Sequence, residues 1–171
     1  MSYMPTFSVR RATPDDAEGV AAVLERIAAE RTHSAIDRAW PPGEQRQYMA
    51  GLSGREAFHV AIAETDRIVG YQSLDLYSPA LATMAHVGQL GSFVLPEWRG
   101  RGVGRALFDA TAAFAASAGY RKLVIQVRAS NAAAQRYYKG LGFVECGRLH
   151  AQVVIDGRQD DEVVMELFLT P

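Results

Sequence analysis

The sequence has few of the features that mark secreted, membrane-spanning or nucleic-acid-binding proteins. It contains one cysteine, which excludes an internal disulfide. No apolar run approaches the roughly 20 residues that span a bilayer, and residues 1–5 show no signal-peptide pattern. The net charge of -1 leaves no general basic surface for nucleic acid or an anionic membrane. We therefore expect a cytoplasmic protein with no nucleic-acid partner and no membrane partner.

Metal-binding and nucleophile patterns are missing as well. The 4 histidines lie far apart, and there is no cysteine pair, so we expect no metal site. The sequence has no Gly-x-Ser-x-Gly turn that would present a serine nucleophile. The lone Cys146 is expected to be a small buried residue rather than a nucleophile.

The length and the hydrophobic pattern predict one domain over residues 1–171, because no repeat, low-complexity tract or linker interrupts the chain. The expected strands cover residues 6–10, 57–64, 68–77, 85–95, 122–127, 143–155 and 159–169. The expected helices cover residues 13–30, 44–52, 103–118 and 131–140. Gly88 and Gly91 inside an expected strand predict a bulge or the close approach of a ligand. This order predicts a mixed α/β sheet covered by helices.

A glycine-rich turn joins the strand that ends near Leu95 to the following helix. Backbone N–H groups in such a turn can converge on one anion, and the helix adds its unpaired donors and the positive end of its dipole. Arginine side chains suit phosphate oxygens. These residues therefore predict a diphosphate site, with a plain strand–helix turn as the alternative. The turn consists of Arg99, Gly100, Arg101, Gly102, Val103, Gly104 and Arg105.

The spacing of this turn excludes two common phosphate motifs. A P-loop needs Gly-Lys-Ser/Thr, which does not follow Gly104, and the glycines do not fit Gly-x-Gly-x-x-Gly. The remaining pattern, Arg-x-x-Gly-x-Gly from Arg99 to Gly104, resembles the acyl-CoA-binding motif of the GNAT superfamily of N-acetyltransferases. A second GNAT-like motif lies further along the chain, separated from the first by an expected helix and an expected strand. It consists of Asn131, Ala134, Tyr138, Gly142 and Phe143.

The resemblance implies a mixed, mostly antiparallel seven-stranded sheet flanked by about four helices, with acetyl-CoA as the acyl donor. In that family the strand before the glycine turn and the strand ending near Val127 splay apart, and the pantetheine arm lies between them. The residues implied to bind the donor are Phe93, Val94, Arg99, Gly100, Arg101, Gly102, Val103, Gly104, Arg105 and Asn131. The resemblance also allows a homodimer formed through the last hairpin.

The implied reaction is direct transfer of an acetyl group from the thioester to a primary amine. A free backbone N–H at Phe93 or Val94 would stabilise the oxyanion that forms on the carbonyl. Tyr138 matches the position of the family's general acid and would protonate the leaving sulfur. Its neighbour Tyr137 points about 100° away on the helix and is assigned to the core.

The base that accepts the proton of the amine stays open. His86 has a suitable ordinary pKa, and a water molecule that relays the proton is the alternative. Glu97 is expected to be a solvated charge or a partner of a helix end. Tyr71, Asp75 and Tyr77 are candidates for one edge of the acceptor pocket, or for the exposed face of a strand.

The acceptor is expected to be a small primary amine, such as an amino acid or a similar compound. The first alternative is a protein N-terminus. Relatives with that activity often carry Glu where this chain has Gln126, which counts against it. The second alternative is an acyl-CoA-binding regulatory module without turnover, and the presence of Tyr138 favours an enzyme.

Overall fold

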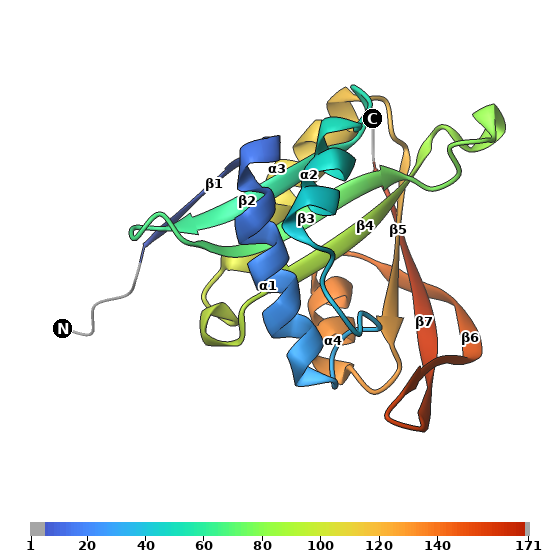
Figure 1. Ribbon diagram of the computed structural model, residues 1–171. Coiled ribbons are helices and arrows are strands. Elements are labelled where there is room, and N and C mark those ends of the chain that lie inside the picture. The colour runs from blue at the N-terminus through green and yellow to red at the C-terminus, as the bar shows by residue number, and fades with distance from the viewer. Residues whose placement is uncertain (1–5, 170–171) are drawn as a thin grey trace.

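The computed structural model describes residues 6–169 and folds them into one seven-stranded sheet with helices on both faces (Figure 1). The strands are β1 (Phe7–Arg11), β2 (Ala57–Ala63), β3 (Ile68–Leu76), β4 (Val87–Val94), β5 (Lys122–Arg128), β6 (Val144–Ile155) and β7 (Arg158–Phe168). The helices are α1 (Ala17–Glu30), α2 (Pro42–Ala50), α3 (Val103–Ser117) and α4 (Ala132–Gly140). The sheet order is β1-β2-β3-β4-β5-β7-β6, and only the β4–β5 pair is parallel. The expected mixed, mostly antiparallel fold is confirmed.

Local sequence signals explain where several elements begin and turn. The Asp16 carboxylate accepts a hydrogen bond from the Thr13 N–H at 2.8 Å, which forms a capping box before α1. Asp156 and Gly157 have φ values of 52° and 74°, as a two-residue turn between β6 and β7 requires. These local signals therefore position α1 and the last hairpin as the sequence predicts.

The sheet separates two helical layers. Alternate residues of a strand face opposite sides, and Phe58 packs against Tyr48 of α2, whereas the next residue, His59, contacts Thr111 of α3. Figure 1 shows α1 and α2 in front of the sheet and α3 behind it. One layer therefore covers Phe58 and its same-face neighbours, and the other covers His59.

The parallel pair β4–β5 parts soon after it begins. Its register runs from Val87↔Lys122 to Gln89↔Val124 and then stops, although β4 continues to Val94 and β5 to Arg128. Figure 1 shows the two strands diverging. We call the space between their unpaired ends the β4–β5 gap; it is the splay that the GNAT resemblance implies.

Some local expectations were wrong. β4 pairs with β3 without a register shift from Gly88 to Val94, so this strand has no bulge on that side. The alternative, the close approach of a ligand, stays a prediction. Gly88 is instead required by packing, because a Cβ there would lie 2.6 Å from Leu74 Cδ1. Cys146 is exposed on β6 rather than buried.

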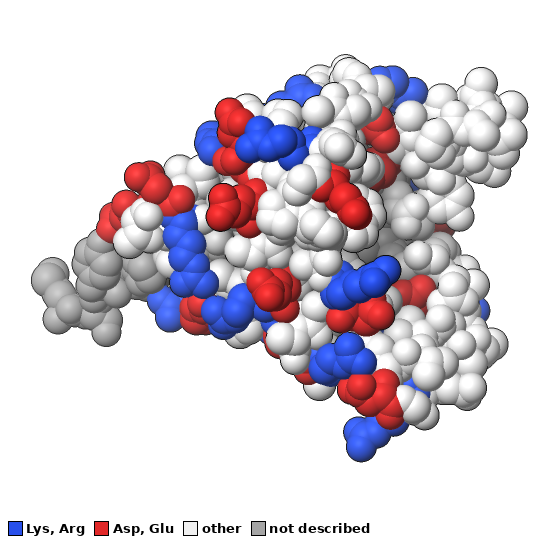
Figure 2. All heavy atoms as spheres, in the orientation of Figure 1, with Lys and Arg blue, Asp and Glu red and all other residues white. Residues whose placement is uncertain are grey.

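Within residues 6–169, no helix is long and apolar enough to cross a membrane. Lys and Arg side chains alternate with Asp and Glu over the face seen in Figure 2, so no single-sign patch dominates that face. This distribution agrees with the small net charge of -1.

Candidate active site

The β4–β5 gap presents unpaired backbone groups. The Leu95 N–H donates to the Val69 carbonyl at 2.9 Å, so the odd-numbered residues of β4 bond to β3. The even-numbered residues therefore turn their N–H and C=O groups toward β5. Beyond the last paired residues, this leaves the N–H groups of Ser92 and Val94 facing the gap.

This alternation separates the two candidates for the oxyanion donor. Phe93 is paired with Tyr71 through its backbone, so its N–H points to β3 and away from the gap. The Val94 N–H faces the gap, while its carbonyl accepts a hydrogen bond from Arg99 Nε at 3.0 Å. Sequence reasoning missed Ser92, whose N–H lies two residues closer to the parting point of the strands.

The glycine-rich turn at the end of β4 has its donors free. Gly100 and Gly102 have φ values of 70° and 84°, and a Cβ at either position would meet no atom within 4 Å. The Ala106 N–H bonds to the Gly102 carbonyl at 3.0 Å. Among residues 6–169, no hydrogen bond of normal geometry is donated by the backbone N–H groups of residues 100–105. The turn and the N-terminus of α3 therefore offer converging donors to an anion.

The arginines of the turn are largely engaged by the protein itself. Arg99 forms a two-point ion pair with Glu30 of α1, and Arg105 pairs with Asp109 at 2.9 Å. Arg101 lies over the Trp98 ring, 6.0 Å from its centroid, and pairs with no carboxylate in the described part of the chain. The backbone donors of the turn and Arg101 are thus freer for a phosphate than Arg99 or Arg105.

Tyr138 reaches the gap from α4. Its side chain is buried, with 4% of its surface exposed, and its phenol interacts with the side chain of Ser92 on β4. Burial raises the pKa of Tyr138 well above the ordinary value, so the phenol stays protonated. The hydroxyl therefore lies beside β4 beyond the point where β5 leaves it.

Tyr137 occupies a different position. Its hydroxyl is buried without a hydrogen-bond partner, and a Cβ at Gly104 would lie 3.1 Å from it. Burial raises the pKa of Tyr137 to about 12. Gly104 thus leaves room for Tyr137 at the start of α3, and this tyrosine packs against the core cluster that includes Tyr138.

Asn131 is the N-cap of α4, as its place before the alanines predicts. Its Oδ1 accepts a hydrogen bond from the Ala134 N–H, and its Nδ2 donates to the His33 carbonyl, both at 3.1 Å. Arg128 Nη1 also donates to the Arg31 carbonyl at 3.3 Å. Both ends of the Asn131 side chain are therefore occupied, and they tether the segment between α1 and α2 to β5 and α4.

His86 is not brought to the gap. It precedes β4 at the end where that strand is still joined to β5, and its carbonyl accepts hydrogen bonds from the N–H groups of Arg121 and Lys122. Ser92 lies six residues further along the chain, which corresponds to roughly 20 Å of extended strand. Glu97 is also engaged elsewhere, because it pairs with Arg26 and Arg67.

A cavity of about 420 Å³ opens on the α2 side of the sheet, beside the point where β4 and β5 part. Asp75 lies in it, directly across β3–β4 from Gln89, the last β4 residue paired to β5. The Tyr48 hydroxyl donates a hydrogen bond to Asp75, and burial raises the pKa of this carboxyl. The lining residues are Tyr48, Glu56, Ser73, Asp75, Leu76, Pro79, Gln89, Leu90 and Gly91.

Sequence reasoning included Asp75 but missed Tyr48 and Glu56, which come from α2 and from the segment before β2. Of the other two candidates for this edge, Tyr71 is a buried core residue stacked on Phe58. Tyr77 is exposed and does not line the cavity.

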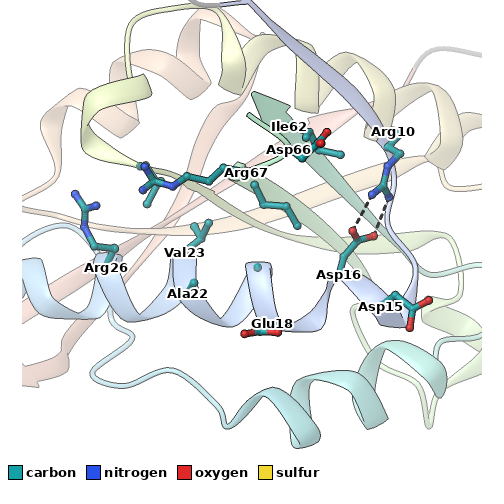
Figure 3. Close-up of a pocket in the computed structure, with 13 residues that line it drawn as sticks. Arg10, Asp15, Asp16, Glu18, Ala22, Val23, Arg26, Ile62, Asp66 and Arg67 are labelled. Carbon is teal, nitrogen blue, oxygen red and sulfur yellow. Dashed lines mark hydrogen bonds and ion pairs between the residues drawn. The ribbon is translucent and has the colours of Figure 1, made fainter. Parts of the chain in front are cut away.

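A second cavity, of about 460 Å³, lies between α1 and the β2–β3 turn, away from the gap (Figure 3). Its rim is charged, and its arginines are ion-paired. Arg10 is ion-paired with Asp16 at 2.8 Å, and Arg26 and Arg67 both bond to Glu97. Each arginine of this rim is therefore engaged by a carboxylate, which leaves their charge less available to an anionic ligand.

Comparison with known proteins places these features in context. The model of the Acetyltransferase (GNAT) family matches residues 22–143. An aminoglycoside N(6')-acetyltransferase type 1 of Stenotrophomonas maltophilia is 32% identical over 145 residues, which are 83% of this chain and 89% of that protein.

Solved structures share the fold. A phosphinothricin acetyltransferase of Sinorhizobium meliloti in complex with AcCoA superposes with a TM-score of 0.87 at 19% identity, covering 96% of this chain and 89% of that one. A ribosomal-protein-alanine N-acetyltransferase of Brucella melitensis superposes with a TM-score of 0.85 at 25% identity. The match covers 95% of this chain and 99% of that one.

Proposed function

The chain belongs to the GNAT family of acetyltransferases, and from this premise we propose that it acetylates a small, cationic primary amine with acetyl-CoA as the donor. The observation that carries the acceptor class is the cavity beside the parting point of β4 and β5, which is lined by Glu56 and by Asp75, whose carboxylate accepts a hydrogen bond from the Tyr48 hydroxyl. Among residues 6–169, no lysine or arginine lines this cavity. An ammonium group is the ligand that such a lining favours.

On the donor side, the diphosphate would bind to the free N–H groups of residues 100–105, with Arg101 adding charge. The pantetheine arm would run along the gap and bond to the Val94 N–H as an added strand does. Ser92, closer to the acceptor cavity, would then direct its N–H toward the thioester carbonyl. The surrounding residues support this fit, because a Cβ at Gly100 or Gly102 meets only open space.

The two faces of the sheet would contribute opposite parts of the reaction. The acceptor ammonium loses a proton to the Asp75 carboxylate, and the neutral amine nitrogen attacks the thioester carbon. The Ser92 N–H donates a hydrogen bond to the oxyanion, and one such donor lowers the activation free energy by about 3 kcal/mol. When the tetrahedral intermediate collapses, the C–S bond breaks and the Tyr138 hydroxyl protonates the thiolate of coenzyme A. Proton loss from the amine and proton gain by the sulfur thus occur on opposite sides of the sheet.

The charge of the cavity discriminates among small amines. A free amino acid carries an α-carboxylate, and in the described part of the chain the lining has no cationic side chain to pair with it. Polyamines and aminosugars carry additional ammonium groups, which the Asp75–Glu56 pair accommodates. This favours cationic amines over the amino acids that the sequence alone suggests. The aminoglycoside named for one relative is an amine of this kind.

An acceptor panel tests the proposal. Thiol release from acetyl-CoA, with mass spectrometry of the products, would be measured for polyamines, aminoglycosides, free amino acids and peptides with free N-termini. We expect turnover with cationic small amines and little with amino acids. Turnover confined to the peptides would instead support a protein N-terminal acetyltransferase, a reading for which the Brucella melitensis structure provides a precedent.

A further inference from the structure

Three polar side chains lie abreast beneath α3 and α4, in a part of the sheet that is otherwise apolar. The strand register aligns His59 of β2 with Gln72 of β3, and Gln72 with Ser92 of β4. Cross-strand neighbours on one face have their Cβ atoms about 5 Å apart. We call His59, Gln72 and Ser92 the buried polar row.

Both ends of this row are tied to a helix. His59 Nδ1 lies 3.0 Å from the Thr111 hydroxyl of α3. At the other end, the Ser92 side chain interacts with the phenol of Tyr138 on α4. The row therefore ends at the tyrosine to which the proposed function gives the role of proton donor.

The middle residue has no partner. Gln72 is fully buried at 0% exposure, and neither its Oε1 nor its Nε2 makes a hydrogen bond. Leucine or methionine would fill this volume without leaving polar atoms unsatisfied. A buried amide between two hydrogen-bonding neighbours is therefore expected to interact with a water molecule that connects it to them.

We propose that Gln72 is a positioning residue that acts on Tyr138 through Ser92, by way of one buried water molecule. The Gln72 amide holds the water, and the water donates to a lone pair of the Ser92 oxygen. With that lone pair occupied, the hydroxyl proton of Ser92 stays on the Tyr138 oxygen. The phenol's own proton then points into the β4–β5 gap, where the leaving sulfur would lie. This inference rests on the proposed role of Tyr138.

The test compares Gln72→Met, Ser92→Ala and the double variant in steady-state kinetics with the best acceptor of the panel. Methionine keeps the volume of Gln72 and removes its polar atoms, so the fold should persist. We expect each single variant to lower kcat by about three- to ten-fold, the range of one hydrogen bond, with the KM for acetyl-CoA unchanged. Because Gln72 acts through Ser92, the double variant should be no slower than Ser92→Ala.

A matched control removes another buried polar group from the same face. Thr111→Val breaks the hydrogen bond to His59 at the far end of the row. It should lower the melting temperature without lowering kcat. A high-resolution crystal structure provides a readout besides activity, since ordered water should contact the Gln72 amide and Ser92 Oγ and be absent in Gln72→Met.

Two outcomes would overturn the inference. An unchanged kcat in Gln72→Met, or losses that multiply in the double variant, would show that Gln72 does not act through Ser92. The role of Tyr138 is tested separately with Tyr138→Phe. If that variant turns over at the wild-type rate, the proposed acid is wrong; if it is slow while Gln72→Met is not, only the positioning role fails.

Discussion

Arg99 and Glu30 form a two-point ion pair, with Nη–Oε distances of 2.6 and 2.8 Å, that joins the glycine-rich turn to the C-terminal end of α1. Arg99 Nε bonds at the same time to the Val94 carbonyl at 3.0 Å. The guanidinium thus holds the turn against both the strand that precedes it and a helix 69 residues away. We interpret Arg99 mainly as a support for the backbone donors of the turn.

This interpretation makes a prediction for binding. Arg99→Ala should raise the Kd for acetyl-CoA by about ten-fold, and Glu30→Gln by about three-fold, because each loosens the turn by roughly one charged hydrogen bond. Isothermal titration calorimetry measures both. Arg26→Ala is the control, since Arg26 also joins α1 to a carboxylate but lies outside the turn. Tighter binding by Glu30→Gln would show instead that Glu30 competes with the diphosphate.

The proposed diphosphate site can be tested with two glycines in the same conformation. Gly102 and Gly119 have φ values of 84° and 83°, and a Cβ at either would meet no atom within 4 Å. Aspartate at either position should lower the free energy of unfolding by roughly 1–2 kcal/mol, because a residue with a side chain is disfavoured in the left-handed conformation. Only Gly102→Asp, however, places a negative charge among the free N–H groups of the turn. Calorimetry should show weakened acetyl-CoA binding for Gly102→Asp and unchanged binding for Gly119→Asp.

Equal loss of affinity in the two glycine variants would contradict this placement of the diphosphate. Thermal melts of both variants without ligand provide the control, because similar melting temperatures show that any difference in affinity is local.

Asp75→Asn should separate activity from stability. Without the carboxylate, kcat/KM is expected to fall by about a hundred-fold, the lower range for general-base catalysis. The wild-type kcat/KM should decrease at acidic pH as Asp75 becomes protonated, and this decrease should be absent in the variant. Glu56→Gln is the comparison: its carboxylate lines the cavity without bonding to Asp75, so it should raise the KM for the amine more than it lowers kcat.

The same variant makes a prediction for stability because burial raises the pKa of Asp75. The groups that face this carboxyl are Tyr48 and Ser73, which bond to it, and Glu56, whose like charge raises its pKa further. A raised native pKa means that the folded state binds the proton more tightly than the unfolded state, so ionised Asp75 destabilises the protein at high pH. The melting temperature of Asp75→Asn should therefore exceed that of wild type at pH 8, and the difference should shrink as the pH falls. A difference that grows toward acidic pH would contradict this sign.

Local features of the site could be predicted from the sequence. The glycine spacing after Leu95 predicts the strand–turn–helix that the structure contains, and Asn131 before a run of alanines predicts the cap of α4. Both signals depend on residues close together in the chain, whose backbone preferences act without help from the rest of the fold.

Long-range features could not be predicted. Whether the N–H of Phe93 or that of Val94 faces the gap depends on which residue pairs of β3 and β4 are hydrogen-bonded. The sequence alone does not show which of the alternating pairs these are. Asp75 and Tyr48 meet across 27 residues, from a strand and a helix whose packing no local pattern specifies. His86 has the right chemistry for a base, but the strand carries it to the end opposite the glycine turn.

The early separation of β4 from β5 divides the sheet into two wings that are joined by few backbone hydrogen bonds. One wing contains β1 to β4 and the other β5 to β7. A donor molecule lying between them would form hydrogen bonds to both wings and connect them. The bound substrate would then contribute to the stability of the folded enzyme during turnover. Departure of coenzyme A would then loosen the whole molecule, linking product release to the mechanical stiffness of the enzyme.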